Sequence, residues 1–320
     1  MKNTIKLTKT IILALILIPV MSCSSSDDVA PTTPMEDTGQ DPTDPVDPVD
    51  PVDPVDPPTP SPVQVSTYAT LQASDGLAID SSGNLFASNY GDSKVYKIDT
   101  DQSVSLFAEN QSGAAGMIFN DQGNLYLARY NASDIVEISD QGNVIQTIAD
   151  NVLGTIALAF DTDGNLYTNN NVNNAVTKIE ASGTKVTINH SIYNNSSVTL
   201  DADNNMYVSD YASGQIIKID AQTNAVSSFV NLPINGGVGF VIYINGNFYV
   251  TAIADHVVYK IDMQGNAEII AGIKGVAGSL DGNGDEARLQ SPNGIVASAD
   301  GNTLYVAQGG SGSIRMITGF

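Results

Sequence analysis

The chain of 320 residues has one cysteine, no tryptophan and two histidines. A single cysteine excludes an intrachain disulfide and a cysteine-based zinc cluster, and two histidines are too few for a three-histidine metal site. Positive charge is also scarce, because 13 Lys and Arg face 35 Asp and Glu, which gives a formal net charge of −22. This balance argues against nucleic acid as a partner and against electrostatic docking on anionic lipid.

The first 22 residues have the pattern of an export signal. Lys2, Lys6 and Lys9 precede a continuous apolar run over residues 11–18. That run is too short to span ~30 Å of hydrocarbon as a transmembrane helix. Residues 1–22 are therefore predicted to be a signal peptide.

The cysteine follows this run directly, in the segment Val-Met-Ser-Cys that ends at Cys23. The segment resembles the lipobox of bacterial lipoproteins, in which a cysteine is lipidated and becomes the new N-terminus. The resemblance implies that a lipid on Cys23 attaches the protein to a membrane. Ser24 and the acidic residues after it resemble the export tag of surface-displayed lipoproteins, which implies a lipid-anchored outer-membrane protein exposed on the cell surface. An ordinary signal peptide with an incidental cysteine is the alternative.

Residues 23–62 are expected to form the lipidated N-terminus and a disordered stalk. Asp-Pro-Val repeats run from Asp44 to Pro57. Proline removes backbone donors and favours polyproline II, while the aspartates repel one another. At ~3.1 Å per residue, the low-complexity stretch of the stalk at residues 31–62 could reach roughly 100 Å. It would either lift the following domain off the membrane or serve as an inert linker.

Residues 63–320 contain six copies of one unit. A Gly-Asn or Asn-Asn pair recurs in each copy, with steps of 40, 41, 40, 42 and 55 residues; the pairs begin at Gly83, Gly123, Gly164, Asn204, Gly246 and Gly301. Each copy reads as four short strands separated by polar turns, with period-two alternation in the third strand. A period of about 40 residues with four strands is typical of a propeller blade. We therefore predict an all-β, six-bladed β-propeller of four-stranded blades.

The two ends of this domain predict how the ring closes. The sixth copy stops after its third strand, at about residues 313–318. Residues 64–70 supply an unassigned strand at the other end of the domain. We expect this N-terminal strand to pair with the last blade, because the pairing would cover an exposed sheet edge.

The repeat resembles the NHL repeat and the related gluconolactonase-like propellers. The resemblance rests on Gly-Leu-Ala-Ile-Asp from Gly76, on Lys-Val-Tyr-Lys-Ile-Asp from Lys94, and on the glycine-rich stretch 278–294. It covers nearly all of 63–320 and implies an NHL-type β-propeller. Function does not follow from it, because such propellers include binding platforms, sensor domains and a few enzymes.

The position before the repeated glycine is the first candidate site, because these loops should meet around the central channel. Its six occupants are Asp75, Ala115, Ile156, Ser196, Val238 and Asn293. The resemblance to gluconolactonase-like enzymes implies that Asp75 and Asn293, on neighbouring blades, hold one divalent cation such as Ca²⁺. A glutamate expected near Ile156 and an asparagine expected near Val238 are absent. The alternative is that Asp75 and Asn293 only form turns.

The loops after the second strands carry a second set of candidates on the same rim. Tyrosines, amides, an arginine and a histidine could bind a polar ligand such as a glycan, peptide or protein; these residues are Tyr90, Arg129, Tyr130, Asn169, Asn171, Tyr211 and His256. Generic loop composition is the alternative. We expect both His190 and His256 to be structural or solvated. The stretch 281–286 departs from an EF-hand loop, which leaves a loose calcium-stabilised loop as its functional alternative.

These features predict a surface-anchored binding scaffold that presents one rim to an extracellular polar ligand. No catalytic residue is assigned, and we expect a binding protein rather than an enzyme. A divalent-metal-dependent lactonase or related hydrolase that uses Asp75 and Asn293 is the alternative. A structural surface protein without a small-molecule site is a further one.

Overall fold

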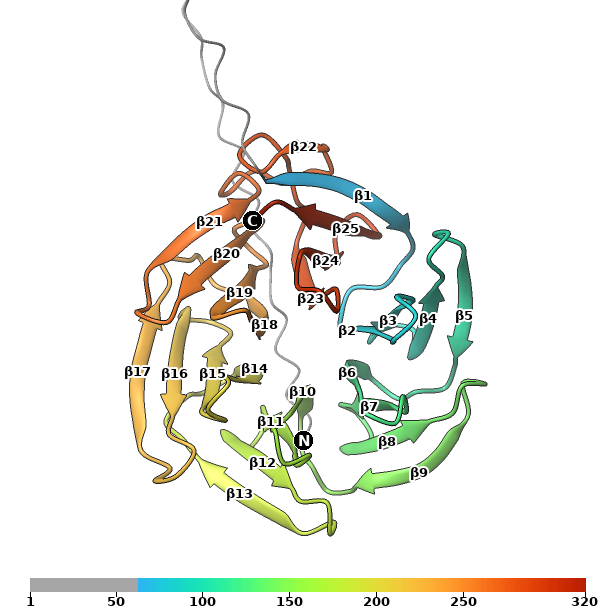
Figure 1. Cartoon of the computed structure of the whole chain (residues 1–320), viewed down its shortest axis with the longest axis vertical. Coiled ribbons are helices and arrows are strands. Elements are labelled where there is room, and N and C mark those ends of the chain that lie inside the picture. The colour runs from blue at the N-terminus through green and yellow to red at the C-terminus, as the bar shows by residue number, and fades with distance from the viewer. Residues whose placement is uncertain (1–62) are drawn as a thin grey trace, which may run out of the picture. The chain divides into compact units, whose positions relative to one another are not determined.

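Residues 63–320 are described in a computed structural model of the chain, and they form 25 β-strands arranged as six sheets around a ring (Figure 1). The all-β, six-bladed propeller predicted from the repeat is therefore confirmed. No helix among the described residues is long and apolar enough to cross a membrane. The predicted signal peptide, Cys23 and the Asp-Pro-Val stalk lie outside the described residues.

Each blade is an antiparallel sheet, and in blades 1 to 5 its strands follow one another in sequence from the ring centre outward. Blade 1 contains β2 (Leu77–Ile79), β3 (Leu85–Asn89), β4 (Lys94–Ile98) and β5 (Val104–Ala108). Blade 2 contains β6 (Ala114–Phe119), β7 (Leu125–Arg129), β8 (Asp134–Ile138) and β9 (Val144–Ala149). Blade 3 contains β10 (Thr155–Phe160), β11 (Leu166–Asn170), β12 (Ala175–Ile179) and β13 (Lys185–Asn189).

The second half of the ring repeats this order. Blade 4 contains β14 (Asn195–Leu200), β15 (Met206–Asp210), β16 (Gln215–Ile219) and β17 (Val226–Asn231). Blade 5 contains β18 (Val238–Ile244), β19 (Asn247–Ala252), β20 (Val257–Asp262) and β21 (Ala267–Ala271). Blade 6 contains β23 (Pro292–Ala297), β24 (Thr303–Gln308), β25 (Ser313–Thr318) and β1 (Gln64–Thr70), with β22 (Gly282–Asn283) as an additional edge strand.

The ring closes as the sequence predicts. The N-terminal strand β1 pairs antiparallel with β25, from Gln64 opposite Thr318 to Thr70 opposite Ser313. The two-residue strand β22 then pairs with the outer edge of β1, which the repeat pattern did not predict. The last blade therefore has five strands where the other five blades have four.

The repeated Asp-x-x-Gly-Asn segment forms the turn between the first and second strands. In blade 1 the Asp80 Oδ1 accepts hydrogen bonds from the backbone N–H of Ser82 and of Asn84, both at 2.9 Å. Gly83 has a φ of +85°, a conformation that glycine adopts without strain. Asn120 in blade 2, Asp161 in blade 3 and Asp201 in blade 4 accept the equivalent bond and Ser298 in blade 6 accepts a similar one, whereas blade 5 turns through Asn245 and Gly246.

Four of the six blades carry the repeated glycine in or directly before the first strand, at Gly76, Gly116, Gly239 and Gly294, and there neighbouring blades approach closely, whereas Ala157 and Ser197 take its place in blades 3 and 4. A Cβ atom on Gly116 would lie 2.2 Å from the carbonyl oxygen of Ile156, and one on Gly294 would lie 1.8 Å from that of Asp75. Such distances are far inside van der Waals contact. The glycines therefore let the first strands crowd around the axis.

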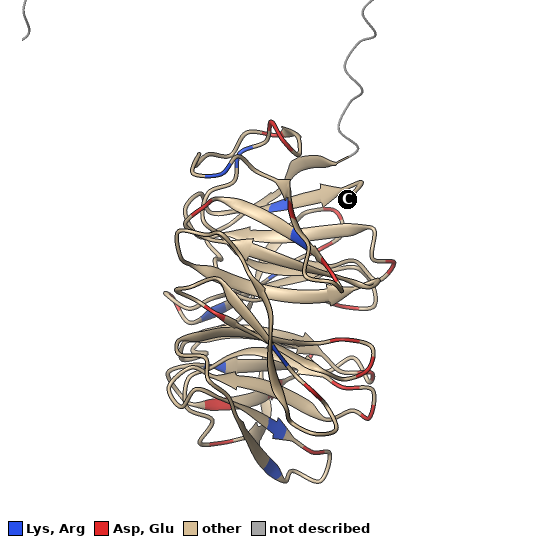
Figure 2. Cartoon of the chain, turned by 90° about the vertical axis from the view of Figure 1, so that its left-hand side faces the viewer, with Lys and Arg blue, Asp and Glu red and all other residues tan. Residues whose placement is uncertain are grey.

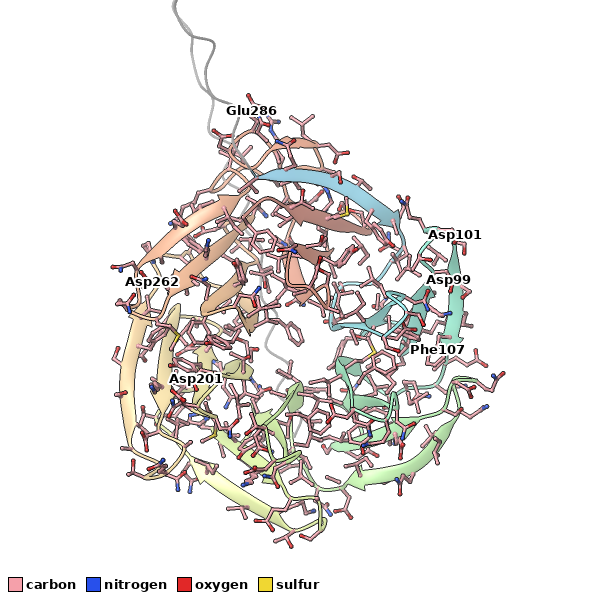
Figure 3. All side chains as sticks on the ribbon, viewed as in Figure 1. Asp99, Asp101, Phe107, Asp201, Asp262 and Glu286 are labelled. Carbon is pink, nitrogen blue, oxygen red and sulfur yellow. The ribbon has the colours of Figure 1, made fainter. Side chains whose placement is uncertain are left out.

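The hydrophobic core lies between adjacent blades. Phe86 of blade 1 packs edge-on against Phe107 of the same blade at 4.8 Å and against Phe119 of blade 2 at 5.1 Å between ring centroids (Figure 3 labels Phe107). Apolar clusters of this kind recur around the ring. Inner strands are mostly buried, whereas outer strands such as β5 are mostly exposed.

The two faces of the ring differ in composition. We call the face with the loops before each first strand and after each second strand the loop face, and the opposite face the hairpin face. Acidic turns gather on the hairpin face, along the right-hand edge of Figure 2 where the C-terminus lies. The described chain begins on this face too, because Gln64 pairs with Thr318 at the end of β25.

Candidate functional site

A cavity of about 360 Å³ opens on the loop face, and each blade contributes one residue to it from the position before the repeated glycine. These residues are Asp75, Ala115, Ile156, Ser196, Val238 and Asn293. We call this cavity the axial pocket. The structure therefore brings the first set of sequence candidates together around the axis. Its volume is within the range of small-ligand sites.

A second ring of residues, each directly after the second strand of its blade, forms more of the wall. Tyr90, Tyr130, Tyr211 and Ile253 contribute to the axial pocket from these positions. The rings of Tyr90 and Tyr130 lie edge-to-face with centroids 5.8 Å apart. The Tyr90 hydroxyl donates to Asn131 Oδ1 at 2.9 Å, which holds this aromatic pair in place.

Asp75 is the one carboxylate in the wall of the axial pocket, and no Lys, Arg or His lines it. Its Oδ2 accepts hydrogen bonds from the Ser74 hydroxyl at 2.9 Å and from the Tyr90 backbone N–H at 2.8 Å. Its Oδ1 lies 3.5 Å from Asn293 Nδ2. Burial raises the pKa of Asp75, and the two hydrogen bonds to Oδ2 oppose that rise.

The wall facing Asp75 and Asn293 around the ring is apolar. Ile156, Val238, Phe240 and Ile253 supply it. Phe240 also lines a second cavity of about 360 Å³ in the central channel, where the first strands present mainly apolar side chains. The axial pocket is thus polar on the side of blades 6 and 1 and apolar at blades 3 and 5, with Ser196 and Tyr211 of blade 4 between the two apolar parts.

Donor chemistry does not fit a calcium ion in this pocket. Asp75 and Asn293 bring two strong oxygen ligands, whereas Ca²⁺ takes six to eight. Ile156 and Val238 stand where the family resemblance implies further ligands. Across residues 63–320, no group of three or more His, Cys, Asp or Glu side chains is arranged to hold a metal ion.

Four other sequence candidates lie outside the axial pocket. Arg129 forms a two-pronged ion pair with Asp134, with N–O distances of 2.8 and 2.5 Å. Asn169 is completely buried, and its amide bonds the Ala157 N–H and Asn195. Asn171 Nδ2 donates to the Asn195 carbonyl at 3.0 Å.

His256 is the fourth, and its Nδ1 accepts from the Ser291 backbone N–H at 3.1 Å. His190 is likewise engaged inside the fold: its Nδ1 accepts from the Ile192 N–H at 3.2 Å, and burial lowers its pKa. Both histidines therefore have structural partners. The ligand-binding roles of Arg129, Asn169, Asn171 and His256 stay predictions.

The stretch 281–286 takes part in ring closure. Asp281 Oδ1 accepts from Arg315 Nη2 at 2.6 Å and from the Thr67 hydroxyl at 3.0 Å. Asn283 accepts from Gln64 and donates to Glu286. These oxygens already serve the packing of the last blade, so the arrangement does not favour a calcium loop.

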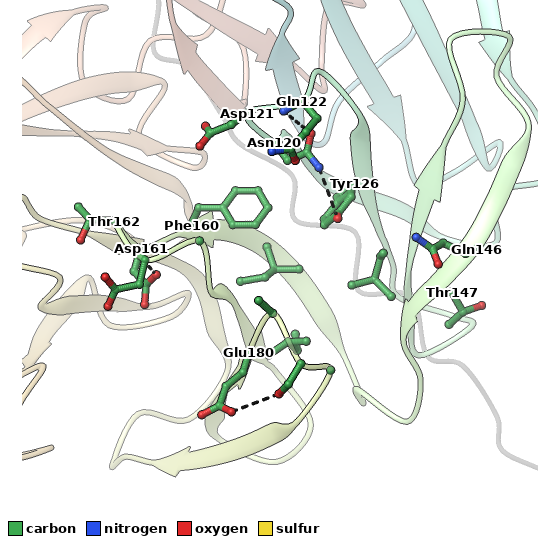
Figure 4. Close-up of a pocket in the computed structure, with 18 residues that line it drawn as sticks. Asn120, Asp121, Gln122, Tyr126, Gln146, Thr147, Phe160, Asp161, Thr162 and Glu180 are labelled. Carbon is green, nitrogen blue, oxygen red and sulfur yellow. Dashed lines mark hydrogen bonds between the residues drawn. The ribbon is translucent and has the colours of Figure 1, made fainter.

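A larger cavity of about 710 Å³ lies on the hairpin face between blades 2 and 3 (Figure 4). The rings of Tyr126 and Phe160 face each other there with centroids 5.7 Å apart. A similar cavity of about 540 Å³ lies between blades 1 and 2. Because the cleft recurs at successive seams, it is a feature of the repeat rather than of one specialised site.

Comparison with known proteins shows the fold. No protein-family model and no curated protein sequence matches the chain. Among solved structures, an auxiliary nutrient binding protein from Bacteroides ovatus is similar with a TM-score of 0.67 and 14% identity, over 81% of this chain and 77% of that one. A gluconolactonase from Xanthomonas campestris is similar with a TM-score of 0.64 and 13% identity, over 80% and 89%.

The fold is that of the gluconolactonase-like six-bladed propellers. A catalytically inactive virginiamycin B lyase from Staphylococcus aureus, crystallised with quinupristin, is also similar, with a TM-score of 0.56 and 17% identity over 76% of this chain and 79% of that one. Proteins described as binding proteins, gluconolactonases and lyases thus share this architecture. At such identities the likeness carries no activity to this chain.

Sequence reasoning missed three lining residues of the axial pocket: Gly239, Phe240 and Ile253. A signal for two of them was present. Ile253 follows its second strand as Tyr90 follows β3, and Phe240 follows the repeated glycine as Leu77 does in blade 1. Aligning all six copies position by position would have placed both near the axis.

Proposed function

We propose that this protein is a surface-anchored binding protein that takes an extracellular ligand in the axial pocket. The observation that carries the proposal is the convergence of one residue from every blade on a cavity of about 360 Å³ with three tyrosines in its wall. Tyrosine offers flat apolar area together with a hydroxyl, which suits recognition of small ligands.

The walls of the axial pocket are held in place by side chains behind them, as a binding site requires. The Ser88 hydroxyl donates to the Ala115 carbonyl at 2.5 Å. The Thr251 hydroxyl donates to the Asn293 carbonyl at 2.6 Å. Each bond joins neighbouring blades directly behind a lining residue, so the pocket is formed before a ligand arrives.

Binding is favoured over hydrolysis by what the lining residues contact. Ser196 is the one serine in the wall, and its hydroxyl bonds the Ser209 hydroxyl at 2.9 Å rather than a histidine or carboxylate. An activated nucleophile needs an adjacent base. The two-oxygen donor set likewise does not favour the metal-dependent lactonase alternative.

The surface attachment in this proposal rests on the sequence of the N-terminal segment. The described chain begins on the hairpin face, whereas the axial pocket opens on the loop face. Cys23 is the proposed lipid-attachment site, on the resemblance of the segment that ends there to a lipobox. We expect Cys23→Ser to release the protein from the outer-membrane fraction. We also expect protease added to intact cells to degrade the wild-type protein, because it would be exposed on the cell surface.

Mutations of the wall test the proposed site. We expect Tyr130→Ala and Tyr211→Ala to weaken a ligand found on glycan, peptide or metabolite arrays by roughly 5-fold or more, without changing the unfolding midpoint, because an aromatic contact is worth about 1 kcal/mol. Tyr193 is 72% exposed and outside the pocket, so Tyr193→Ala is the matched control. Binding that survives both pocket variants would place the ligand elsewhere.

A further inference from the structure

We propose that the axial pocket takes an organic ammonium compound, whose charged nitrogen pairs with Asp75 and whose apolar body lies against Ile156, Val238 and Phe240. This inference rests on the proposed function and names the ligand class of the same site. It follows from the charge, aromatic content and polarity of the described wall.

Charge comes first. The carboxylate of Asp75 has no ion-pair partner among the described residues, and its Oδ1 has only the 3.5 Å contact with Asn293 Nδ2. A partly buried carboxylate without a cation is costly, as the raised pKa of Asp75 reflects. A ligand that brings a positive charge removes this cost, and one that brings a negative charge increases it.

Aromatic content points to an organic cation. Tyr90, Tyr130, Tyr211 and Phe240 surround the same cavity as Asp75. The face of an aromatic ring attracts an ammonium group, and several rings together with a carboxylate favour it further. The two-oxygen donor set argues against a bare divalent ion as the cation, since such an ion needs more oxygen ligands than this wall provides.

The polarity of the pocket wall indicates that the rest of the ligand is apolar. Opposite the carboxylate the wall is apolar, and Phe240 extends it into the channel. The Ser196 hydroxyl is already bonded to Ser209 and the Tyr90 hydroxyl to Asn131, so these two groups are not left for the many hydroxyls of a sugar. Residues 63–320 also carry 10 Lys and Arg against 25 Asp and Glu, so long-range attraction favours cations.

Matched probes test the ligand class. We would measure binding of 2-phenylethylamine, phenyltrimethylammonium, the neutral 2-phenylethanol and the anionic 3-phenylpropanoate to the purified protein by calorimetry and ligand-observed NMR. We expect both cations to bind about 30-fold or more tighter than the neutral and anionic probes, the ratio for a desolvated charge pair worth about 2 kcal/mol. A capped lysine-containing tripeptide separates a free amine from a peptide ammonium as the source.

Variants separate the inferred ligand class, an organic cation, from the proposed binding site, the axial pocket. We expect Asp75→Asn to abolish the preference for cations, and Asp150→Asn, at an exposed carboxylate outside the pocket that pairs with Lys185, to keep it. Circular dichroism and unfolding midpoints establish that each variant is folded.

Each outcome tests either the ligand class or the binding site. Equal affinity for amine and alcohol, or amine affinity unchanged in Asp75→Asn, would overturn the cation inference; binding that still depends on Tyr130 would then leave the pocket as the binding site. Stoichiometric Ca²⁺ binding that displaces the amine would overturn the inference in favour of a metal site. Failure of every probe and of every array ligand to bind would overturn the proposed function as well.

Discussion

The buried carboxylate of Asp75 lowers the free energy of unfolding, and a bound cation can offset this loss. Burial raises its pKa above the ordinary 3.8, so the folded chain holds the proton more tightly than the unfolded chain does. The unfolding free energy therefore falls as pH rises through the window from 3.8 to the raised value. Its polar neighbours are Ser74, Tyr90 and Asn293, and no charged side chain from the pocket wall compensates it.

We therefore expect Asp75→Asn to stabilise the ligand-free protein at pH 7 by on the order of 1 kcal/mol, as substitutions at functional sites commonly do. The gain should vanish below pH 3.8, where the carboxyl is protonated in both states. Thermal unfolding of both proteins between pH 3 and 8 measures it. A wild type that is the more stable at pH 7 contradicts this account.

Arg315 is the second residue whose role depends on burial. Its side chain is completely buried and donates to the carbonyls of Arg288 at 2.9 Å and Leu280 at 3.1 Å and to Asp281 at 2.6 Å. It thereby ties β25 to the long segment before β23. Burial lowers the pKa of Arg315, and the Asp281 carboxylate opposes this change.

We expect Arg315→Met to lower the unfolding free energy by about 2–4 kcal/mol, because it removes the charged bond to Asp281 together with the bonds to two carbonyls, and a hydrogen bond to a charged group is worth about 1.5–3 kcal/mol. Urea unfolding provides the measurement. The matched control is Arg288→Met, at an exposed arginine in the same segment, which should change stability by less than about 0.5 kcal/mol. Equal effects of the two substitutions would show that the guanidinium bonds of Arg315 are not stabilising.

At the scale of the strand, the glycine near the start of β23 determines how closely blades 6 and 1 approach. Replacing Gly294 by Ala would put a Cβ atom 1.8 Å from the Asp75 carbonyl, a clash that only a shift of β23 relieves. We expect Gly294→Ala to cost about 1–3 kcal/mol, as overpacking does, and to weaken ligand binding because it displaces Asp75.

The matched control for this strand is Gly91→Ala. Gly91 lies in the loop after β3, where an added Cβ atom would meet only the Asn89 side chain at 3.3 Å. We expect near-wild-type stability and binding in that variant. The free energy of unfolding and the ligand affinity of both variants, measured on the same preparations, test this expectation. Wild-type stability and affinity in Gly294→Ala would refute the role of close approach.

At the scale of the whole molecule, β1 joins the two ends of the chain. It buries Val65 and Ala69 and covers the edge of β25. We expect deletion of 63–70 to abolish cooperative unfolding and to promote aggregation, because it exposes a sheet edge and opens the ring. Deletion of 31–62, the predicted stalk, is the control and should leave the unfolding midpoint unchanged.

A circular permutant distinguishes loss of closure from loss of residues. Gln64 lies opposite Thr318, so a short turn after the C-terminus could place the β1 sequence as an ordinary fourth strand of blade 6. We expect this permutant to unfold cooperatively, as the parent does. An unfolded permutant would show that closure needs the native order of strands.

Sequence alone determined the strands, the turns and the ring. The Asp80 turn with its Gly83, the alternating third strands and the separated β1 are local patterns, and local hydrogen bonding and burial are enough to specify them. The repeated glycine also indicated which positions would meet at the axis. The three rim tyrosines in the axial pocket were therefore within reach of sequence reasoning.

Only the tertiary structure decided how each polar side chain is used. Asn169 looks like a binding residue in the sequence, and in the fold it is buried and bonds Asn195 of the next blade, while its ligand-binding role stays a prediction. Arg315 reads as an ordinary strand residue, yet it is buried and holds the last blade together. These partners come from other loops, strands and blades, so ring closure and blade packing, rather than local sequence pattern, select them.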